Sequence, residues 1–92
     1  MVKLSNYIVR SNKIAWQIVD GNAMIVIPSE PSLCALNSTA TRIWELIGEG
    51  QKVDNIVQKL CSEFDVSEQE AEDKAIKFIE ELLDKGAVEI IV

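Results

Sequence analysis

Residues 36–46 read Leu-Asn-Ser-Thr-Ala-Thr-Arg-Ile-Trp-Glu-Leu, and the pattern of apolar residues changes within this stretch. Upstream of it, apolar side chains alternate with others, which is typical of β-strands. Downstream, the apolar residues recur at helical spacing, beginning with Ala40, Ile43, Trp44 and Ile47, and we expect Trp44 in the core. Asn37 or Ser38 can cap this helix by accepting a backbone N–H. The sequence therefore predicts strands followed by helices, the order of an α+β fold.

Three strands are expected upstream, over residues 13–20, 23–27 and 32–36. Asp20-Gly21-Asn22 joins the first two strands and is a strong signal for a hairpin turn. Proline donates no hydrogen bond to a ladder, so the segment from Pro28 to Pro31 separates the second strand from the third. We therefore expect a three-stranded antiparallel N-terminal sheet whose third strand is short and lies at the edge.

Three helices are expected downstream, over residues 37–48, 53–61 and 68–85. Ser67 and Glu70 match the capping box at the start of the third helix. The apolar side chains of this helix span an arc of roughly 160°, which is wider than one core-facing side requires. A short strand over residues 87–92 follows, and the complete order is that of a winged helix-turn-helix-like domain.

The composition indicates one globular domain, which we take to be residues 1–92. No apolar run approaches the ~18 residues that can span a membrane. The N-terminal segment lacks the apolar stretch of a signal peptide, so we expect a cytoplasmic protein. Cys34 and Cys61 are expected to be small buried apolar side chains and not a disulfide or a metal pair.

The side chains offer no catalytic set. The chain contains no histidine, which removes the commonest general base and the commonest neutral metal ligand. Ser38, Thr39 and Thr41 carry hydroxyl groups, but no base accompanies them. We therefore expect no enzymatic activity, no cofactor and no bound metal.

Negative charge is concentrated in the second half of the chain. The net charge is −6, and residues 47–92 hold five lysines against twelve acidic residues. The expected third helix alone carries seven acidic residues, three lysines and no arginine. Binding to nucleic acid or to an anionic membrane requires clustered Lys or Arg, so neither is expected as a partner.

The stretch from Leu36 to Leu46 also resembles the PqqD family, whose pattern is Leu-Asn-x-Thr/Ser-Ala-x-x-Ile-Trp-Glu-Leu. The similarity continues at Ile56, Leu60, Phe64, Phe78, Leu82 and Gly86, so that it covers about residues 13–92. This resemblance implies a three-stranded sheet packed on three helices. It also implies a non-catalytic module that binds the leader segment of a ribosomally synthesised precursor peptide.

The implied partners are the precursor peptide and a modifying enzyme, such as a radical-SAM maturase or a leader peptidase. The pathway would be that of PQQ or of another modified peptide. The protein itself is expected to be a monomer or a weak homodimer.

The resemblance also implies where the leader binds: it adds as a strand to the third strand of the sheet, against the last helix. On this chain the strand positions are Ser32, Leu33, Cys34, Ala35 and Leu36. Alternation directs Cys34 and Leu36 inward and the two residues between and before them outward. On the helix, helical geometry adds Asp73, Lys74, Lys77, Phe78 and Glu81, with Phe78 as an apolar anchor for a peptide of mixed charge. The alternative is that Lys74, Lys77 and Glu81 only pair with their helix neighbours.

Two other functions remain open at this level. A helix-turn-helix of this kind occurs in winged-helix transcription regulators, although the acidic third helix disfavours that function. Leader-recognition domains also occur fused to enzymes, so the chain could be an interaction subunit or a fragment of a larger modification enzyme.

The charge of the third helix predicts that the protein does not bind duplex DNA in a sequence-specific manner. A helix with this acidic excess would be repelled by the phosphates on either side of the major groove. Gel-shift titration at about 150 mM salt, where weak phosphate contacts are screened, should show no retention. Sequence-specific retention under these conditions would contradict the assignment.

Overall fold

The computed structural model describes residues 2–27 and 30–91. Its strands are β1 (Tyr7–Arg10), β2 (Ala15–Val19), β3 (Asn22–Ile27), β4 (Glu30–Ala35), β5 (Gln51–Lys52) and β6 (Val88–Ile91). Its helices are α1 (Ser38–Ile47), α2 (Val53–Glu63) and α3 (Glu68–Asp84). The predicted α+β order is confirmed, and each helix ends within one or two residues of its expected bounds.

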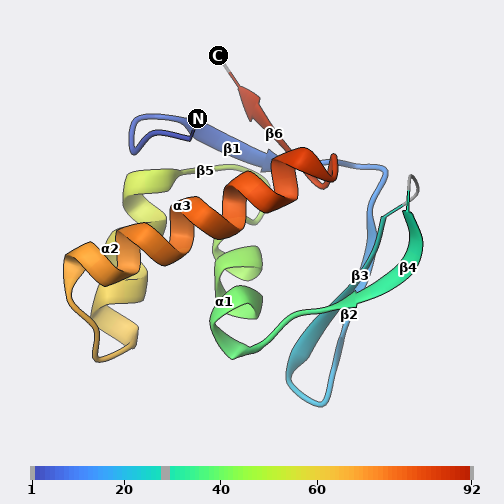
Figure 1. The fold of residues 1–92 in the computed structure, drawn as a ribbon, viewed down its shortest axis with the longest axis horizontal. Helices are drawn as coiled ribbons and strands as arrows, with labels where there is room; N and C mark the ends of the chain where they lie inside the picture. Colours follow the sequence, from blue (N-terminus) through green and yellow to red (C-terminus); the bar gives the residue numbers. More distant parts are fainter. Residues whose placement is uncertain (1, 28–29, 92) are drawn as a thin grey trace.

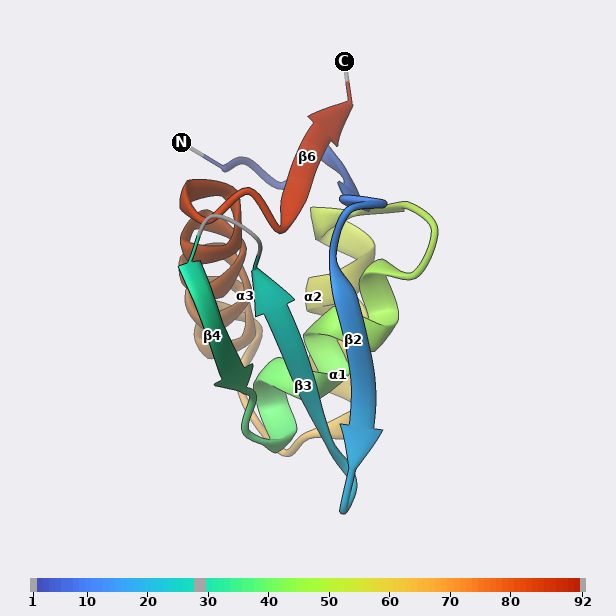
Figure 2. The same cartoon turned by 90° about the vertical axis from the view of Figure 1, so that its right-hand side faces the viewer.

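The strands form two three-stranded antiparallel sheets, where the sequence had predicted one. The sheet β2-β3-β4 is the expected N-terminal sheet. The second sheet, β5-β1-β6, was not expected: β6 pairs along the whole of β1, from Tyr7 opposite Ile91 to Arg10 opposite Val88. Figures 1 and 2 show this sheet above the helices, where both termini lie. Its strands are short and come from distant parts of the chain, so no local pattern predicts their pairing.

The β2–β3 hairpin turns at Asp20 and Gly21, as predicted. Both residues have positive φ, 52° and 84° respectively, and Val19 pairs with Asn22. Positive φ at both central positions defines a type I′ turn, whose twist matches that of the two strands it joins. The Asp-Gly pair therefore sets the register of this hairpin.

The third strand of the same sheet begins at Glu30, so the prediction that it begins at Ser32 is wrong by two residues. Pro31 lies inside β4. An edge strand tolerates proline where the missing N–H would not have entered the ladder. The expected interruption at Pro28 and Ser29 lies outside the described residues.

Both sheets and all three helices contribute to one apolar core, and Trp44 of α1 is completely buried in it, as expected. Trp16 of β2 meets the Trp44 ring edge-on, with 6.0 Å between centroids. The Arg10 guanidinium of β1 lies over both rings and donates two hydrogen bonds, of 2.7 and 3.1 Å, to the Trp44 carbonyl oxygen. Desolvation lowers the pKa of Arg10, and the Glu45 carboxylate opposes that shift. This cluster joins β1 and β2 to α1.

Thr41 is the buried polar side chain among the described residues, with 4% of its surface exposed. Its hydroxyl accepts a hydrogen bond from the Ala23 amide at 2.9 Å and donates one to the Leu36 carbonyl at 3.3 Å. The Leu36 amide in turn donates to the Ala23 carbonyl at 2.9 Å. The Thr41 hydroxyl thus bridges Ala23 and Leu36, one position beyond the last β3–β4 pair, and fixes the sheet to the helix.

We predict that Thr41→Val lowers the free energy of unfolding by about 2–4 kcal/mol, because it leaves two buried backbone groups without a partner. Thr41→Ser retains the hydroxyl and should cost only about 1 kcal/mol, mainly for the lost methyl group. Urea unfolding of both variants compares these values. Valine preserves the volume of threonine, so a Val variant as stable as the Ser variant would show that packing alone matters at this position.

Candidate functional site

The outer edge of β4 is open: among residues 2–27 and 30–91, this strand pairs with β3 alone. The Leu36 amide donates to β3. In an antiparallel ladder, residues whose N–H and C=O face the neighbouring strand alternate with residues whose N–H and C=O face away from it. The register pairs Cys34 with Ile25 and Ala35 with Met24. Backbone groups of Cys34 therefore face β3, whereas those of Leu33 and Ala35 face the open edge.

The predicted side-chain directions along β4 are confirmed. Leu36 is buried and Cys34 half-buried on the side of the core, while Leu33 (64% exposed) and Ala35 lie outside. Leu36 therefore belongs to the core, and its backbone groups bond to Ala23 and Thr41 and do not face the open edge. The side chain of Ser32 is outside the described part of the chain.

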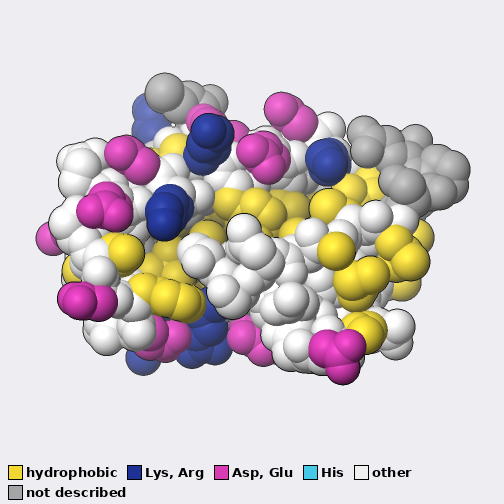
Figure 3. Space-filling view, turned by 60° about the horizontal axis from the view of Figure 1, so that its bottom comes forward, with side chains coloured by type: hydrophobic (Ala, Val, Ile, Leu, Met, Phe, Trp, Pro, Cys, Tyr) yellow, Lys and Arg dark blue, Asp and Glu magenta, His cyan; other side chains and the backbone are white. Residues whose placement is uncertain are grey.

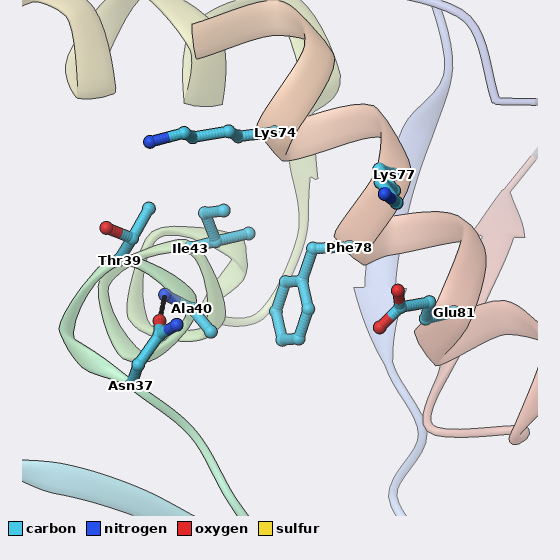
Figure 4. A pocket seen from close by; sticks show the side chains of 8 residues that line it. All are labelled: Asn37, Thr39, Ala40, Ile43, Lys74, Lys77, Phe78 and Glu81. Atoms are coloured by element: carbon cyan, nitrogen blue, oxygen red, sulfur yellow. Dashed lines mark hydrogen bonds between the residues drawn. The ribbon is translucent and has the colours of Figure 1, made fainter. Parts of the chain in front are cut away.

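α3 lies beside this edge, and Figure 2 shows β4 as the strand of its sheet on the side of that helix. A groove of about 290 Å³ opens between α3 and the start of α1. From α3 it is lined by Lys74, Lys77, Phe78 and Glu81, and from α1 by Asn37, Thr39, Ala40 and Ile43. Figure 4 shows the Phe78 ring extending from α3 toward α1, with Lys74 on one side of it and Glu81 on the other.

The wide apolar arc of α3 explains why one of its sides remains open. Ala75, Ile79 and Leu82 in its centre are fully buried, whereas Phe78 at one margin is only half-buried. The other margin lies next to the N-terminal segment: the buried Val2 donates its amide to a Glu80 carboxylate oxygen at 3.1 Å. The Phe78 margin is therefore the one that faces the groove.

Of the five positions expected on the helix, the structure brings four into the groove. Asp73 is not among its lining residues; it is exposed and accepts a hydrogen bond from Gln69 at 3.1 Å. The prediction that Asp73 lies at the site is therefore wrong, because its side chain bonds to a neighbour on its own helix. Asp73 precedes Phe78 by five residues, which places it about 140° from Phe78 round the helix, so its side chain points away from the groove.

The four α1 residues of the groove were not among the predicted site residues. Asn37 caps α1, since its side chain accepts the Ala40 amide at 2.8 Å, and Ser38 is the first helical residue. The sequence predicts that α1 is amphipathic. That pattern does not show that the first turn of α1 faces α3. Thr39 and Ala40 are half-buried there, which is the sign of a partly covered helix face.

The surface around the groove combines apolar and charged groups. Figure 3 shows hydrophobic side chains in a band across the middle of one face, bordered by Lys or Arg and by Asp or Glu side chains. Lys74 and Lys77 provide positive charge on the α3 side of the groove, and Glu81 provides a negative charge one turn further on. Such a surface can hold an extended peptide with apolar and charged side chains.

Across residues 2–27 and 30–91, no cluster of three Cys, Asp or Glu side chains is placed to hold a metal ion. Over the same part of the chain, every helix is too short or too polar to cross a bilayer.

Fold and groove together define a class of protein: a small α+β module in which an open edge strand and a helix border an apolar groove. The family described as "Coenzyme PQQ synthesis protein D (PqqD)" matches residues 23–88 of this sequence. This match extends over more than half of the chain, and the chain belongs to the PqqD family. The resemblance inferred from residues 36–46 is thereby confirmed.

A solved structure with the same fold is described as "TbiB1 in Complex with the TbiA(beta) Leader Peptide". The two chains superpose with a TM-score of 0.80 at 23% sequence identity, over 88% of this chain and 94% of the other. At this identity the similarity establishes the fold. No curated protein sequence matches this chain.

We predict that Asn37→Ala lowers the free energy of unfolding by about 1 kcal/mol, because the Ala40 amide loses its cap. Ser38→Ala, one residue further on, should change stability by no more than a few tenths of a kcal/mol, because this side chain does not cap the helix. Thermal melting of the two variants and of Asn37→Asp, which retains a capping oxygen, measures the difference. Equal losses in the two alanine variants would show that Asn37 is not the cap.

Proposed function

We propose that this protein binds the leader segment of a ribosomally synthesised precursor peptide by strand addition to β4 and presents it to a modifying enzyme. The observation that carries the proposal is the open edge of β4 beside a groove formed by α1 and α3. Membership of the PqqD family supports it, and so does the shared fold with a protein described in complex with a leader peptide.

Main-chain hydrogen bonds would provide the affinity. Leu33 and Ala35 offer outward N–H and C=O groups, the arrangement that an added strand requires. Because these groups belong to the backbone, they accept many sequences. Selectivity must therefore come from side chains beside the strand.

The groove supplies that selectivity. Phe78, Ile43 and Ala40 offer an apolar surface for one side chain of the peptide. Lys74 and Lys77 favour an acidic residue nearby, and Glu81 favours a basic one toward the C-terminal end of α3. The peptide would thus be amphipathic, with apolar residues facing the groove and charged residues along its border.

The protein would act by binding and not by chemistry of its own. The modifying enzyme, such as a radical-SAM maturase or a leader peptidase, would receive the precursor held in this way. The pathway would be the maturation of coenzyme PQQ or of another modified peptide. A winged-helix regulator is less well supported, because the exposed side of α3 carries acidic residues and would repel DNA.

The test is the substitution Ala35→Pro, measured by calorimetry against the synthetic leader segment of a precursor peptide that the wild type binds. Proline removes the outward N–H of residue 35 but no bond of the β3–β4 ladder, so the fold should persist. We expect the dissociation constant to rise at least about tenfold, because a main-chain bond is lost and the ring hinders the approaching strand.

Two controls isolate the edge. Ala35→Val retains the N–H and should bind like the wild type. Ile18→Pro removes an outward N–H from the opposite edge of the same sheet. Ile18 pairs with Ala23, and because the Ala23 backbone groups face β4, those of Ile18 face away from β3. Unchanged leader binding by a folded Ala35→Pro variant would exclude strand addition at β4.

A further inference from the structure

A second, smaller pocket of about 90 Å³ lies beyond the groove, where α1, α2 and α3 meet. Leu60 of α2 and Ala71 of α3 are its most buried lining residues, with 2% and 1% exposed. Phe64 and Val66, from the connection between α2 and α3, are half-buried beside them. Apart from two residues at its border, the pocket is therefore apolar.

Those two residues, Thr39 and Lys74, also line the groove. The pocket and the groove are consequently neighbours along the same α1–α3 boundary and share these two side chains. In Figure 4 the Lys74 side chain extends from α3 toward the side of Thr39. A peptide that leaves the groove at this end passes directly over the pocket.

The pocket is held in its present shape by the α2–α3 connection. The Cys61 thiol donates to the Val66 carbonyl at 3.4 Å, and the Phe64 amide donates to the Leu60 carbonyl at 2.9 Å. α3 presents a methyl group here, at Ala71, and a larger side chain at this position would occupy the space. The small side chain of Ala71 thus leaves space beside a connection that these two hydrogen bonds hold.

The size of the pocket restricts what it can hold. A cavity of about 150 Å³ accommodates benzene, so a space of 90 Å³ suits an aliphatic side chain better than an aromatic one. The Lys74 ammonium at its border would also favour a carboxylate on a neighbouring residue of the same peptide.

We propose that this pocket is a second anchor site, which receives an aliphatic side chain of the leader peptide beyond the segment that pairs with β4. The proposal rests on the proposed function, since it assumes that a peptide occupies the groove. The peptide would pair with β4, place one apolar residue against Phe78, cross the first turn of α1 and end at Phe64 and Val66. Selectivity would then depend on the spacing between two apolar residues.

The experiment selects peptides from a displayed library of random peptides about 16 residues long, first on the wild type and then on Ala71→Leu. Leucine is a good helix former and fills the pocket from its inner end. Peptides selected on the wild type should share two apolar positions at fixed spacing, the second of them aliphatic. On Ala71→Leu the second preference should disappear while the first remains.

A thermodynamic cycle on one selected peptide gives the magnitude. Replacing its second apolar residue by alanine should weaken binding to the wild type about tenfold or more, as expected for removing a buried aliphatic side chain. The same replacement should leave binding to Ala71→Leu unchanged. Gln69→Leu, an exposed position near the start of α3 and outside both cavities, is the control and should behave like the wild type.

The outcomes separate the two proposals. In one outcome, the selected peptides bind the wild type and lose binding on Ala35→Pro, but no second apolar position responds to Ala71→Leu. This result would overturn the second anchor and leave the groove intact. An absence of selected peptides, or selected peptides indifferent to Ala35→Pro, would overturn both. If Ala71→Leu does not fold, Val66→Phe replaces it, because the larger side chain at this half-buried position also blocks the pocket. Peptide selection on Val66→Phe is then interpreted in the same way.

Discussion

The hydroxyl group of Thr41 is the interaction on which the rest of the arrangement depends. It lies one position beyond the β3–β4 ladder, between the Ala23 amide and the Leu36 carbonyl. A buried polar group without partners costs about 1–3 kcal/mol, so the hydroxyl and both backbone groups are satisfied only when α1 begins at this distance from the sheet. One side chain of α1 thereby fixes where β4 ends and where the helix starts.

The candidate site follows from that constraint. With the beginning of α1 fixed, Asn37 and Thr39 lie at one wall of the groove, and the wide apolar arc of α3 provides the other. The N-terminal segment lies next to one margin of the arc through Val2, and Phe78 remains at the open margin. Strand pairing requires only an unpaired edge, so a rigid scaffold without a catalytic group suffices for the proposed role.

Much of this arrangement was predictable from sequence because its signals are local. The Asp20-Gly21 turn, the Ser67 cap of α3 and the helical spacing around Trp44 each involve neighbouring residues, and the structure bears them out. Of the capping box predicted at Ser67, the bond from the Glu70 amide to the Ser67 hydroxyl is present. The side-chain directions of Leu33 and Cys34 followed from the two-residue period of a strand. The three helices were therefore placed within one or two residues of their bounds.

What the sequence did not predict depends on contacts between distant segments. β1 pairs with β6, which lies at the other end of the chain, and β5 has only two residues. The bridging role of Thr41 requires knowing that Ala23 and Leu36 are opposite each other, and the α1 wall of the groove requires knowing how α1 and α3 pack. Asp73 was assigned to the site because helical geometry alone does not distinguish two adjacent faces.

The most direct test of the central claim is amide hydrogen exchange of the isotopically labelled protein, with and without the leader segment of a precursor peptide that it binds. If the leader adds to β4, the outward amides of Leu33 and Ala35 become protected, while that of Ile18 on the opposite edge does not change. Saturating leader that leaves the exchange of Leu33 and Ala35 unchanged would contradict strand addition at this edge.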